Sequence, residues 1–345
     1  MIGLFKTAPG PGNLELREAP VPKPMPGQAV IRVEACGICG SDLHIRNWDT
    51  QLPMKPPVII GHEFSGEIVE LGEGVESWQL GDAVTCEPTY EACGVCLHCQ
   101  EGFYNLCPSR RVLGFWANGA FAEYVAVPAS RLHRLPPGLS FEEGAMSEPL
   151  ACSVHAVCEL TRIDPGDLVL LSGPGAIGLF CLQLARLAGG RVVVAGTSAD
   201  RQRMKVAGSL GADRLVDVQK EDLKEAVAGL SGGLGADVVL ECSGSEAAAN
   251  TGIELVRKRG RYTQVGLFGR PIKIDFEKIA YKEIQVTGSL AQRWPAWRRT
   301  MQLVGEGQVS LKPVATDVMP LSRWSEAFAK LERKEGIKIL LRPGA

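Results

Sequence analysis

Four cysteines within fifteen residues constrain this chain more than any other feature of its sequence. They follow the spacing Cys93-x2-Cys96-x2-Cys99-x7-Cys107. Four thiolates fill every position of a tetrahedral zinc ion, so a site of this kind holds a loop together and leaves no place for a substrate. A disulfide knot is the alternative, but the N-terminal residues show no export signal, which favours a reducing compartment. The spacing therefore predicts a structural zinc site in a cytoplasmic protein.

The composition of the chain indicates which kinds of binding partner to expect. A chain of 345 residues exceeds what one core usually holds, so we expect two domains. The formal net charge is only −2 and no block of Lys and Arg stands out, which argues against a nucleic-acid partner. The most apolar stretch, residues 168–188, is interrupted by glycines and a proline, whereas a membrane helix needs about 18 apolar residues. We therefore expect a small-molecule partner and no membrane.

Two sequence patterns divide the chain. Residues 1–150 contain short β-branched runs broken by Pro and Gly, which is typical of a β-rich domain. Beyond them, apolar strand-like runs alternate with helix-like stretches, and this alternation predicts an α/β domain with a parallel, doubly wound sheet. The expected strands of this domain are residues 168–172, 192–195, 236–241, 261–265 and 284–287. Residues 294–306 and 321–333 are amphipathic, and residues 337–341 resemble a final strand.

A glycine motif follows the first of these strands. It reads Ser172-Gly173-Pro174-Gly175-Ala176-Ile177-Gly178 and precedes a helical run at residues 179–188. In such a motif Gly173 forms the tight turn, Gly175 lets the backbone approach a pyrophosphate, and Gly178 allows the helix to pack closely on the strand. The motif in this context predicts a dinucleotide cofactor.

The end of the second strand indicates which dinucleotide is bound. NAD-binding proteins commonly place an Asp or Glu there for the ribose 2′-hydroxyl, but this chain has Gly196. Thr197, Ser198 and Arg201 follow, and we expect their hydroxyls and guanidinium group to contact a 2′-phosphate and favour NADP. The alternative is that Arg201 is a solvated helix residue, that Asp200 caps a helix, and that NAD is bound.

Two upstream segments combine metal ligands of different kinds. Residues 36–44 read CGICGSDLH and residues 61–66 read GHEFSG. Together they offer a thiolate at Cys39, an imidazole at His62 and a carboxylate at Glu63, an incomplete set that leaves one zinc position open for a substrate. The alternatives are that His62 and Glu63 lie on a surface loop and that Cys39 adds to the four-cysteine site.

Another candidate carboxylate, Glu148, lies in the segment SEPL at the predicted junction of the domains, where a substrate would meet a cofactor. These motifs, in this order and with Gly336-Ile337-Lys338 near the C-terminus, resemble those of zinc-dependent medium-chain alcohol dehydrogenases. The resemblance runs from end to end and is strongest to the branch of polyol (sorbitol-type) and threonine 3-dehydrogenases.

The resemblance implies an architecture and two zinc sites. A GroES-like catalytic domain would occupy residues 1–150, a Rossmann domain residues 151–290, and residues 291–345 would return to the catalytic domain. A homotetramer is favoured over a homodimer. The family's catalytic zinc ligands correspond to the cysteine, histidine and glutamate of the two segments above, with Glu148 either ligating zinc or holding its water. The four-cysteine loop corresponds to a structural zinc site, which makes two zinc ions per chain.

The reaction that the resemblance implies is hydride transfer between an alcohol carbon and nicotinamide C4. Ser41 and His44 match positions that pass the hydroxyl proton towards water. The expected nicotinamide contacts lie in three turns, at Cys242, Ser243, Val265, Gly266, Leu267 and Ser289.

The substrate is the least constrained part of this prediction. Where sorbitol dehydrogenases carry an Arg-Tyr pair this chain reads Leu290-Ala291-Gln292-Arg293-Trp294, and Ile45 stands where an aromatic residue is usual. We expect an enzyme that acts on a secondary alcohol or polyol, or on the corresponding ketone. The alternatives are a threonine 3-dehydrogenase-like enzyme, a zinc-independent reductase of the same superfamily, and a non-enzymatic NADP-binding redox sensor, against which the intact zinc ligands argue.

Overall fold

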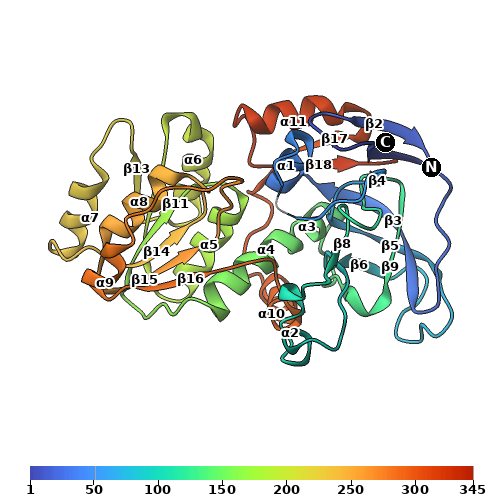
Figure 1. Cartoon of the computed structure of the whole chain (residues 1–345), viewed down its shortest axis with the longest axis horizontal. Helices are drawn as coiled ribbons and strands as arrows, with labels where there is room; N and C mark the ends of the chain where they lie inside the picture. Colours follow the sequence, from blue (N-terminus) through green and yellow to red (C-terminus); the bar gives the residue numbers. More distant parts are fainter. Residues whose placement is uncertain (51, 345) are drawn as a thin grey trace.

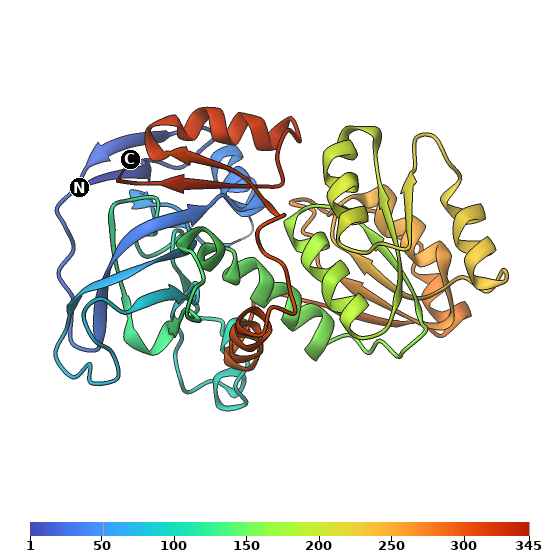
Figure 2. The same cartoon turned by 180° about the vertical axis from the view of Figure 1, so that it is seen from behind.

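Two lobes lie side by side in the computed structural model, which describes residues 1–50 and 52–344 (Figure 1). The N-terminal lobe carries both chain termini, and the central lobe contains a six-stranded sheet from the middle of the chain. Figure 2 shows from behind that the last strands of the chain lie in the N-terminal lobe. Within the described residues, no helix combines the length and the apolar character needed to cross a bilayer.

A mixed seven-stranded sheet organises the N-terminal lobe, in the order β10-β6-β5-β3-β18-β17 with β9 also paired to β3. Its strands are β3 (Gln28–Gly37), β5 (Glu63–Leu71), β6 (Ala83–Cys86), β9 (Tyr124–Pro128), β10 (Leu132–Arg134), β17 (Ala315–Pro320) and β18 (Lys338–Arg342). β18 pairs with β3, so strands from opposite ends of the chain share one sheet. In the antiparallel pair β3–β5, Gly37 lies opposite Glu63, which brings the two ligand-bearing segments together.

Smaller elements complete this lobe. The remaining strands are β1 (Ile2–Lys6), β2 (Leu14–Glu18), β4 (Val58–Ile59), β7 (Thr89–Glu91) and β8 (Arg111–Val112). The helices are α1 (Gly40–Asn47), α2 (Leu97–Gln100), α3 (Phe141–Ala145) and α11 (Trp324–Glu332). α1 begins after Cys39 with a capping box, in which the side chain of Asp42 accepts the backbone N–H of Cys39.

The central lobe is built on a parallel sheet with the strand order β13-β12-β11-β14-β15-β16. Its strands are β11 (Leu168–Ser172), β12 (Arg191–Gly196), β13 (Arg214–Asp217), β14 (Ala236–Glu241), β15 (Val256–Gln264) and β16 (Gln285–Gly288). Its helices are α5 (Ala176–Leu187), α6 (Arg201–Ser209), α7 (Leu223–Ser231), α8 (Glu246–Leu255) and α9 (Glu277–Lys282). Every residue of β11 is buried, because helices cover both faces of a parallel sheet.

Successive residues of a strand point to opposite faces and therefore join different cores. Val169 and Leu171 of β11 pack in a core with α5 and α6, whereas Leu168 and Leu170 pack in a core with α7 and α8. The sheet is thus doubly wound, and the predicted α/β fold class with a β-rich neighbouring domain is confirmed.

Two connections join the lobes. α4 (Ser147–Val154) continues into a π-helical turn at His155–Glu159 and leads into the central lobe, and the chain returns between β16 and α10 (Trp294–Gly305). α4 packs against both α5 and α10. One core contains Leu150 of α4, Leu182 of α5 and Leu303 of α10, so the lobes share buried apolar residues.

Three features of the central lobe differ from the sequence pattern. The helix after the glycine motif begins at Ala176 and not at residue 179, because the motif itself forms its first turn. β15 begins at Val256 and not at residue 261, because the first half of the strand is a charged run without the apolar residues expected of a strand. β13 is not predicted, because its four residues include only two apolar ones.

Candidate active site and metal centres

Three ligand residues of different kinds gather at the end of the β3–β5 pair. The Sγ atom of Cys39, a ring nitrogen of His62 and a carboxylate oxygen of Glu63 lie within 4.8 Å of one another. Both His62 and Glu63 are buried, so the surface-loop alternative is wrong. Cys39 groups with these two residues and not with the four-cysteine loop.

A buried carboxylate lies behind His62. The Oδ1 atom of Asp42 is 3.8 Å from His62 Nδ1, while Oδ2 accepts the Cys39 N–H at 2.8 Å. This arrangement leaves Nε2, which is 3.5 Å from Ser41 Oγ, as the nitrogen available to a metal ion. Burial raises the pKa of Asp42 to about 6. Burial alone would lower the pKa of His62, but the hydrogen bond with Cys39 and the charge of Asp42 outweigh it and raise that pKa to about 10. The site therefore favours a positive charge.

Glu63 also forms a buried ion pair. Lys338 Nζ donates to both carboxylate oxygens of Glu63, at 2.8 and 2.5 Å, and to the Ile38 carbonyl oxygen at 3.0 Å. Burial acts to lower the pKa of Lys338, but the charge of Glu63 outweighs it and the pKa is raised. Gly37 provides the space for this pair, because a Cβ at this position would collide with the Glu63 carboxylate.

Glu148 lies outside the three-residue cluster. Its Oε1 atom accepts the side-chain N–H of Gln292 at 2.8 Å and the S–H of Cys152 at 3.7 Å. Burial raises the pKa of Glu148, while the charge of His62 opposes this shift. Gln292 belongs to the connection that returns from the central lobe, so both connections contribute to this region.

A partly buried arginine lies near Glu148. Arg110 Nε donates to Thr89 Oγ1 at 2.9 Å, and within the described residues its guanidinium group has no carboxylate within ion-pair distance. Burial lowers the pKa of Arg110, and the nearby Cys152 and Glu148 oppose this shift. Arg110 is therefore a cation beside the candidate site without an acidic partner of its own.

α1 carries the two residues predicted to relay a proton. Ser41 faces His62, and one turn later His44 Nδ1 is hydrogen-bonded with Asp49 Oδ1 at 2.9 Å. Gly269 of the central lobe approaches so closely that a Cβ there would lie 3.0 Å from His44 Cε1. His44 therefore lies at the boundary between the lobes.

The second group of ligands is the four-cysteine loop. Its four sulfur atoms lie within 4.8 Å of one another. Cys93 Sγ and Cys99 Sγ are 4.0 Å apart, close to the roughly 3.8 Å that Zn–S bonds of about 2.3 Å imply for a tetrahedron. Backbone N–H groups of Val95 and Cys96 lower the pKa of Cys93 to about 6. All eleven cysteines have free thiols, so the disulfide alternative is wrong.

Both groups of ligands suit zinc by their chemistry. Four thiolates form a closed structural set, and a thiolate with an imidazole and a carboxylate forms an incomplete one. Around the incomplete set, the carboxylates of Asp42, Glu63 and Glu148 are buried beside the single ammonium group of Lys338. Of these carboxylates, Asp42 and Glu148 favour a proton on His62, and a bound cation would take the place of that proton.

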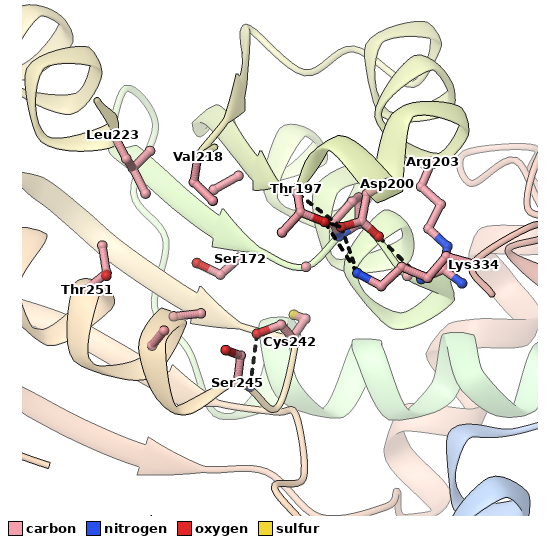
Figure 3. A pocket seen from close by; sticks show the side chains of 18 of the residues that line it. Ser172, Thr197, Asp200, Arg203, Val218, Leu223, Cys242, Ser245, Thr251 and Lys334 are labelled. Carbon is pink, nitrogen blue, oxygen red and sulfur yellow. Dashed lines mark hydrogen bonds and ion pairs between the residues drawn. The ribbon is translucent and has the colours of Figure 1, made fainter. Parts of the chain in front are cut away.

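A cavity of about 720 Å³ opens at the C-terminal ends of β11, β12 and β14, where dinucleotides bind in sheets of this kind (Figure 3). The predicted contacts that border it are Gly173, Gly175, Gly196, Thr197, Cys242 and Ser243. The predicted contacts that do not border it are Ala176, Ile177, Gly178, Ser198, Arg201, Val265, Gly266, Leu267 and Ser289. Gly266 nevertheless packs closely against Gly244, next to the turn at Cys242 and Ser243.

Arg201 does not border the cavity, so its contact with the cofactor stays a prediction. Arg201 is exposed at the start of α6, and the Ser198 hydroxyl donates to Asp217 Oδ2 at 2.6 Å. The charged residues that border this end of the cavity are instead Asp200, Arg203 and Lys334 (Figure 3). Arg203 lies one turn along α6 from Asp200, a spacing that sequence alone could have suggested, whereas Lys334 is brought in by the fold.

Comparisons with known proteins identify the family. Residues 25–137 match the alcohol dehydrogenase GroES-like domain, and residues 176–306 match the zinc-binding dehydrogenase domain. A sorbitol dehydrogenase from Halalkalibacterium halodurans is 46% identical over 99% of this chain and 99% of its own length. The chain belongs to the zinc-binding alcohol dehydrogenase family. The predicted resemblance, and with it the class of an NAD(P)-dependent, zinc-dependent alcohol or polyol dehydrogenase, is confirmed.

Further members of the zinc-binding alcohol dehydrogenase family are similar along nearly their whole lengths. A D-arabitol-phosphate dehydrogenase from Enterococcus avium is 40% identical over 99% of this chain and 97% of its own. An L-threonine 3-dehydrogenase from Pyrococcus horikoshii is 36% identical over 95% of this chain and 94% of its own. The crystal structure of a zinc-binding dehydrogenase from Sinorhizobium meliloti bound to NADP has a TM-score of 0.91, with 33% identity over 99% of both chains.

Proposed function

We propose that this dehydrogenase transfers a hydride between a secondary alcohol or polyol and NADP, with Cys39, His62 and Glu63 holding a catalytic zinc ion. The observation that carries this proposal is the convergence of the three ligand atoms within 4.8 Å, in a chain that also forms a dinucleotide-sized cavity. When bound, zinc supplies a Lewis acid that lowers the pKa of an alcohol, and NADP supplies the hydride acceptor.

The residues around the cluster position the ligands and move the proton. Asp42 Oδ1 lies 3.8 Å from His62 Nδ1 and places a negative charge on that side of the ring, which leaves Nε2 for the metal ion. Ser41 Oγ lies beside that nitrogen and accepts the hydroxyl proton, and His44 at the lobe boundary passes it towards water. Glu148, held by Gln292, supplies a further carboxylate that ligates zinc directly or through water.

The same proposal covers the organisation of the enzyme. The four-cysteine loop holds a second, structural zinc ion, giving two per chain. Residues 1–150 and 291–345 form the catalytic domain and residues 151–290 the cofactor domain, which the pairing of β18 with β3 supports. β16 is an edge strand on which Val286 is 47% exposed, and this edge supports pairing between copies in a cytoplasmic homo-oligomer, with a tetramer favoured over a dimer.

A phosphorylated polyol is a second candidate substrate, and Arg110 is the observation that favours it. A partly buried guanidinium group without a carboxylate partner is costly unless an anion binds to it. The D-arabitol-phosphate dehydrogenase among the relatives acts, by its name, on a substrate with such an anionic group. In this proposal Arg110 contacts the substrate phosphate while the hydroxyl carbon faces the three-residue cluster.

A cofactor-reduction assay tests the function and the substrate class together. The substrates are sorbitol, D-arabitol, their phosphates, 2,3-butanediol and L-threonine, each with NAD and with NADP, before and after treatment with a chelator. Chelator-sensitive turnover of a polyol or polyol phosphate with NADP supports the proposal. Turnover confined to L-threonine favours the threonine dehydrogenase alternative. Absence of turnover with every pair, in protein that retains zinc, contradicts the proposed substrate class.

Adjacent arginines provide a matched control for the phosphate. Arg110→Met should raise KM for a polyol phosphate about ten- to hundred-fold and leave KM for the free polyol unchanged, because a charge-assisted bond is lost. Arg111→Met removes an exposed arginine that is paired with Glu91, and it should change neither of these two KM values. Equal KM values for the two variants would rule out a phosphate contact at Arg110.

A further inference from the structure

The ribose end of the cofactor cavity lacks the carboxylate that usually recognises NAD. Gly196 ends β12, and a Cβ there would lie 2.9 Å from Met204 Sδ and 3.2 Å from Pro174 Cγ, so a larger residue would have to displace the Met204 side chain. Asp200 does border the cavity, but the N–H and hydroxyl groups of Thr197 donate to its Oδ2 atom at 3.0 and 2.6 Å. The other oxygen, Oδ1, lies 3.6 Å from Arg203 Nη1, so a cation already stands beside the oxygen left for a ribose 2′-hydroxyl.

Two cations border the same end. Lys334 Nζ donates to Asp200 Oδ2 at 3.0 Å, and Arg203 Nη1 lies 3.6 Å from Asp200 Oδ1. Figure 3 shows Thr197, Asp200, Arg203 and Lys334 next to one another at this rim. Two positive charges against one carboxylate leave a local excess of positive charge, as a phosphate site requires.

The other acidic residues that border the cavity are engaged elsewhere. Glu221 forms an ion pair with Arg214. Asp222 caps α7, where its Oδ1 atom accepts the N–H of Lys224 at 2.7 Å. Neither carboxylate is paired with Lys334 or Arg203.

The two cations come from different lobes. Lys334 lies between α11 and β18 of the N-terminal lobe, in the left-handed conformation with φ of 58° that is costly for a residue with a Cβ. Arg203 lies in α6 of the central lobe, and its Nε and Nη2 atoms donate to the Gly336 carbonyl oxygen at 3.0 and 2.8 Å. The lobes therefore meet at this rim through charged and hydrogen-bonding groups.

We propose that Lys334 and Arg203 form a 2′-phosphate subsite shared by the two lobes, so that NADP, and not NAD, ties the C-terminal segment to the central lobe. The inference rests on the proposed NADP-dependent function and assigns the role expected of Arg201 to residues that border the cavity. A phosphate between the two cations becomes the partner of Lys334, while Asp200 keeps its bonds to Thr197.

Binding of cofactor fragments tests this subsite without turnover. The probes are adenosine 2′,5′-bisphosphate and 5′-AMP, which differ only by the 2′-phosphate, titrated calorimetrically into the whole enzyme. The wild type should bind the bisphosphate at least about ten-fold more tightly. Lys334→Met should weaken bisphosphate binding about ten- to hundred-fold and leave AMP unchanged. Lys330→Met is the control, since Lys330 lies on α11 and pairs with Asp317 outside the cavity.

Hydrogen exchange tests the link between the lobes. The bisphosphate should slow amide exchange at residues 333–337 in the wild type and not in the Lys334→Met variant, whereas AMP should not slow it in either. Equal affinity of the wild type for the two probes, or equal bisphosphate affinity of the Lys334→Met and Lys330→Met variants, overturns the subsite.

Turnover separates this inference from the proposed function. Arg203→Gln provides an independent second variant on the other lobe and should reduce the preference for the bisphosphate in the same direction. Normal polyol turnover in a wild type that binds both probes equally refutes the subsite and retains the proposed function. Failure of turnover with both dinucleotides, in protein that prefers the bisphosphate, refutes the substrate proposal and retains the subsite.

Discussion

Asp42 shows how one residue without a predicted metal role can control a metal site. One carboxylate oxygen accepts the Cys39 N–H, and the other lies 3.8 Å from His62 Nδ1, so the charge of Asp42 acts on two ligand residues at once. Asp42→Asn should reduce zinc affinity at the catalytic site about ten- to hundred-fold, because the amide no longer supports the imidazole with a full charge. Zinc retention against a competing chelator, followed together with kcat, measures this effect.

A half-buried aspartate on β17 gives the comparison. Asp317→Asn removes a partly exposed ion pair with Lys330, which involves none of the ligand residues, and should leave zinc retention unchanged. Equal zinc retention in the Asp42→Asn and Asp317→Asn variants would show that Asp42 is only a structural helix cap.

The buried ion pair between Lys338 and Glu63 should contribute strongly to stability. Lys338→Met leaves a buried carboxylate without its partner and should lower the free energy of unfolding of the metal-free protein by about 3–5 kcal/mol. Adding Glu63→Gln should restore more than half of the loss, since the unpaired charge is removed. Urea denaturation of both variants measures this. Additive losses in the double variant would mean that the two residues do not act as a pair.

At the residue scale, the sequence does not identify a site residue whose partner lies far away along the chain. Cys39, His62 and Glu63 could be named because a metal site needs particular side chains and because each lies within a short, distinctive segment. Gln292 and Lys334 could not be named in this way. Their partners, Glu148 and Asp200, lie 144 and 134 positions away along the chain, and only the fold brings them together.

At the scale of elements, the glycine motif between β11 and α5 meets two requirements. Gly178 allows close packing of the helix, and Gly175 allows close approach of the cofactor. Gly178→Ala should lower the stability by about 1–3 kcal/mol, because the added Cβ would collide with the Gly173 carbonyl oxygen. Gly175→Ala should leave the melting temperature unchanged, because nothing lies within 4 Å of a Cβ there, but it should weaken dinucleotide binding about ten-fold. Thermal unfolding and cofactor titration of both variants separate packing from binding. A destabilised Gly175→Ala variant would contradict this division.

Elements are predictable where their pattern is long and uniform. β11 and β14 match the expected strands residue for residue, since apolar runs such as Leu168–Leu171 and Val238–Leu240 in an alternating α/β chain indicate buried parallel strands. β13 is missed because an edge strand is partly exposed and needs few apolar residues. The first half of β15 is missed because Arg257, Lys258 and Arg259 lie in an irregular stretch between the paired residues Val256 and Arg261, where charged side chains can remain exposed.

At the scale of the whole molecule, the four-cysteine loop supports a connection between the lobes. The Arg293 guanidinium group lies 4.2 Å from the Phe103 ring of that loop, and Asn105 donates to the Leu290 carbonyl oxygen at 2.8 Å. Arg293 also pairs with Glu159, in the π-helical turn of the other connection, at 2.9 Å. The loop, the returning connection and the π-helical turn therefore form one continuous set of contacts.

This continuity predicts that loss of the structural metal reaches the boundary between the lobes. Cys96→Ser opens the tetrahedral set, so Phe103 and Asn105 should lose their fixed positions, and amide exchange should accelerate at residues 289–294 as well as in the loop. Exchange in β11 and β14 should stay slow, because their core lies apart from the loop. Cys181→Ser, which changes a cysteine of α5 outside both ligand groups and outside this set of contacts, is the control. Faster exchange confined to residues 93–107 would show that the loop is structurally independent of the lobes. Faster exchange at residues 289–294 would show that a closed metal site away from the catalytic cluster helps to hold the two lobes in place.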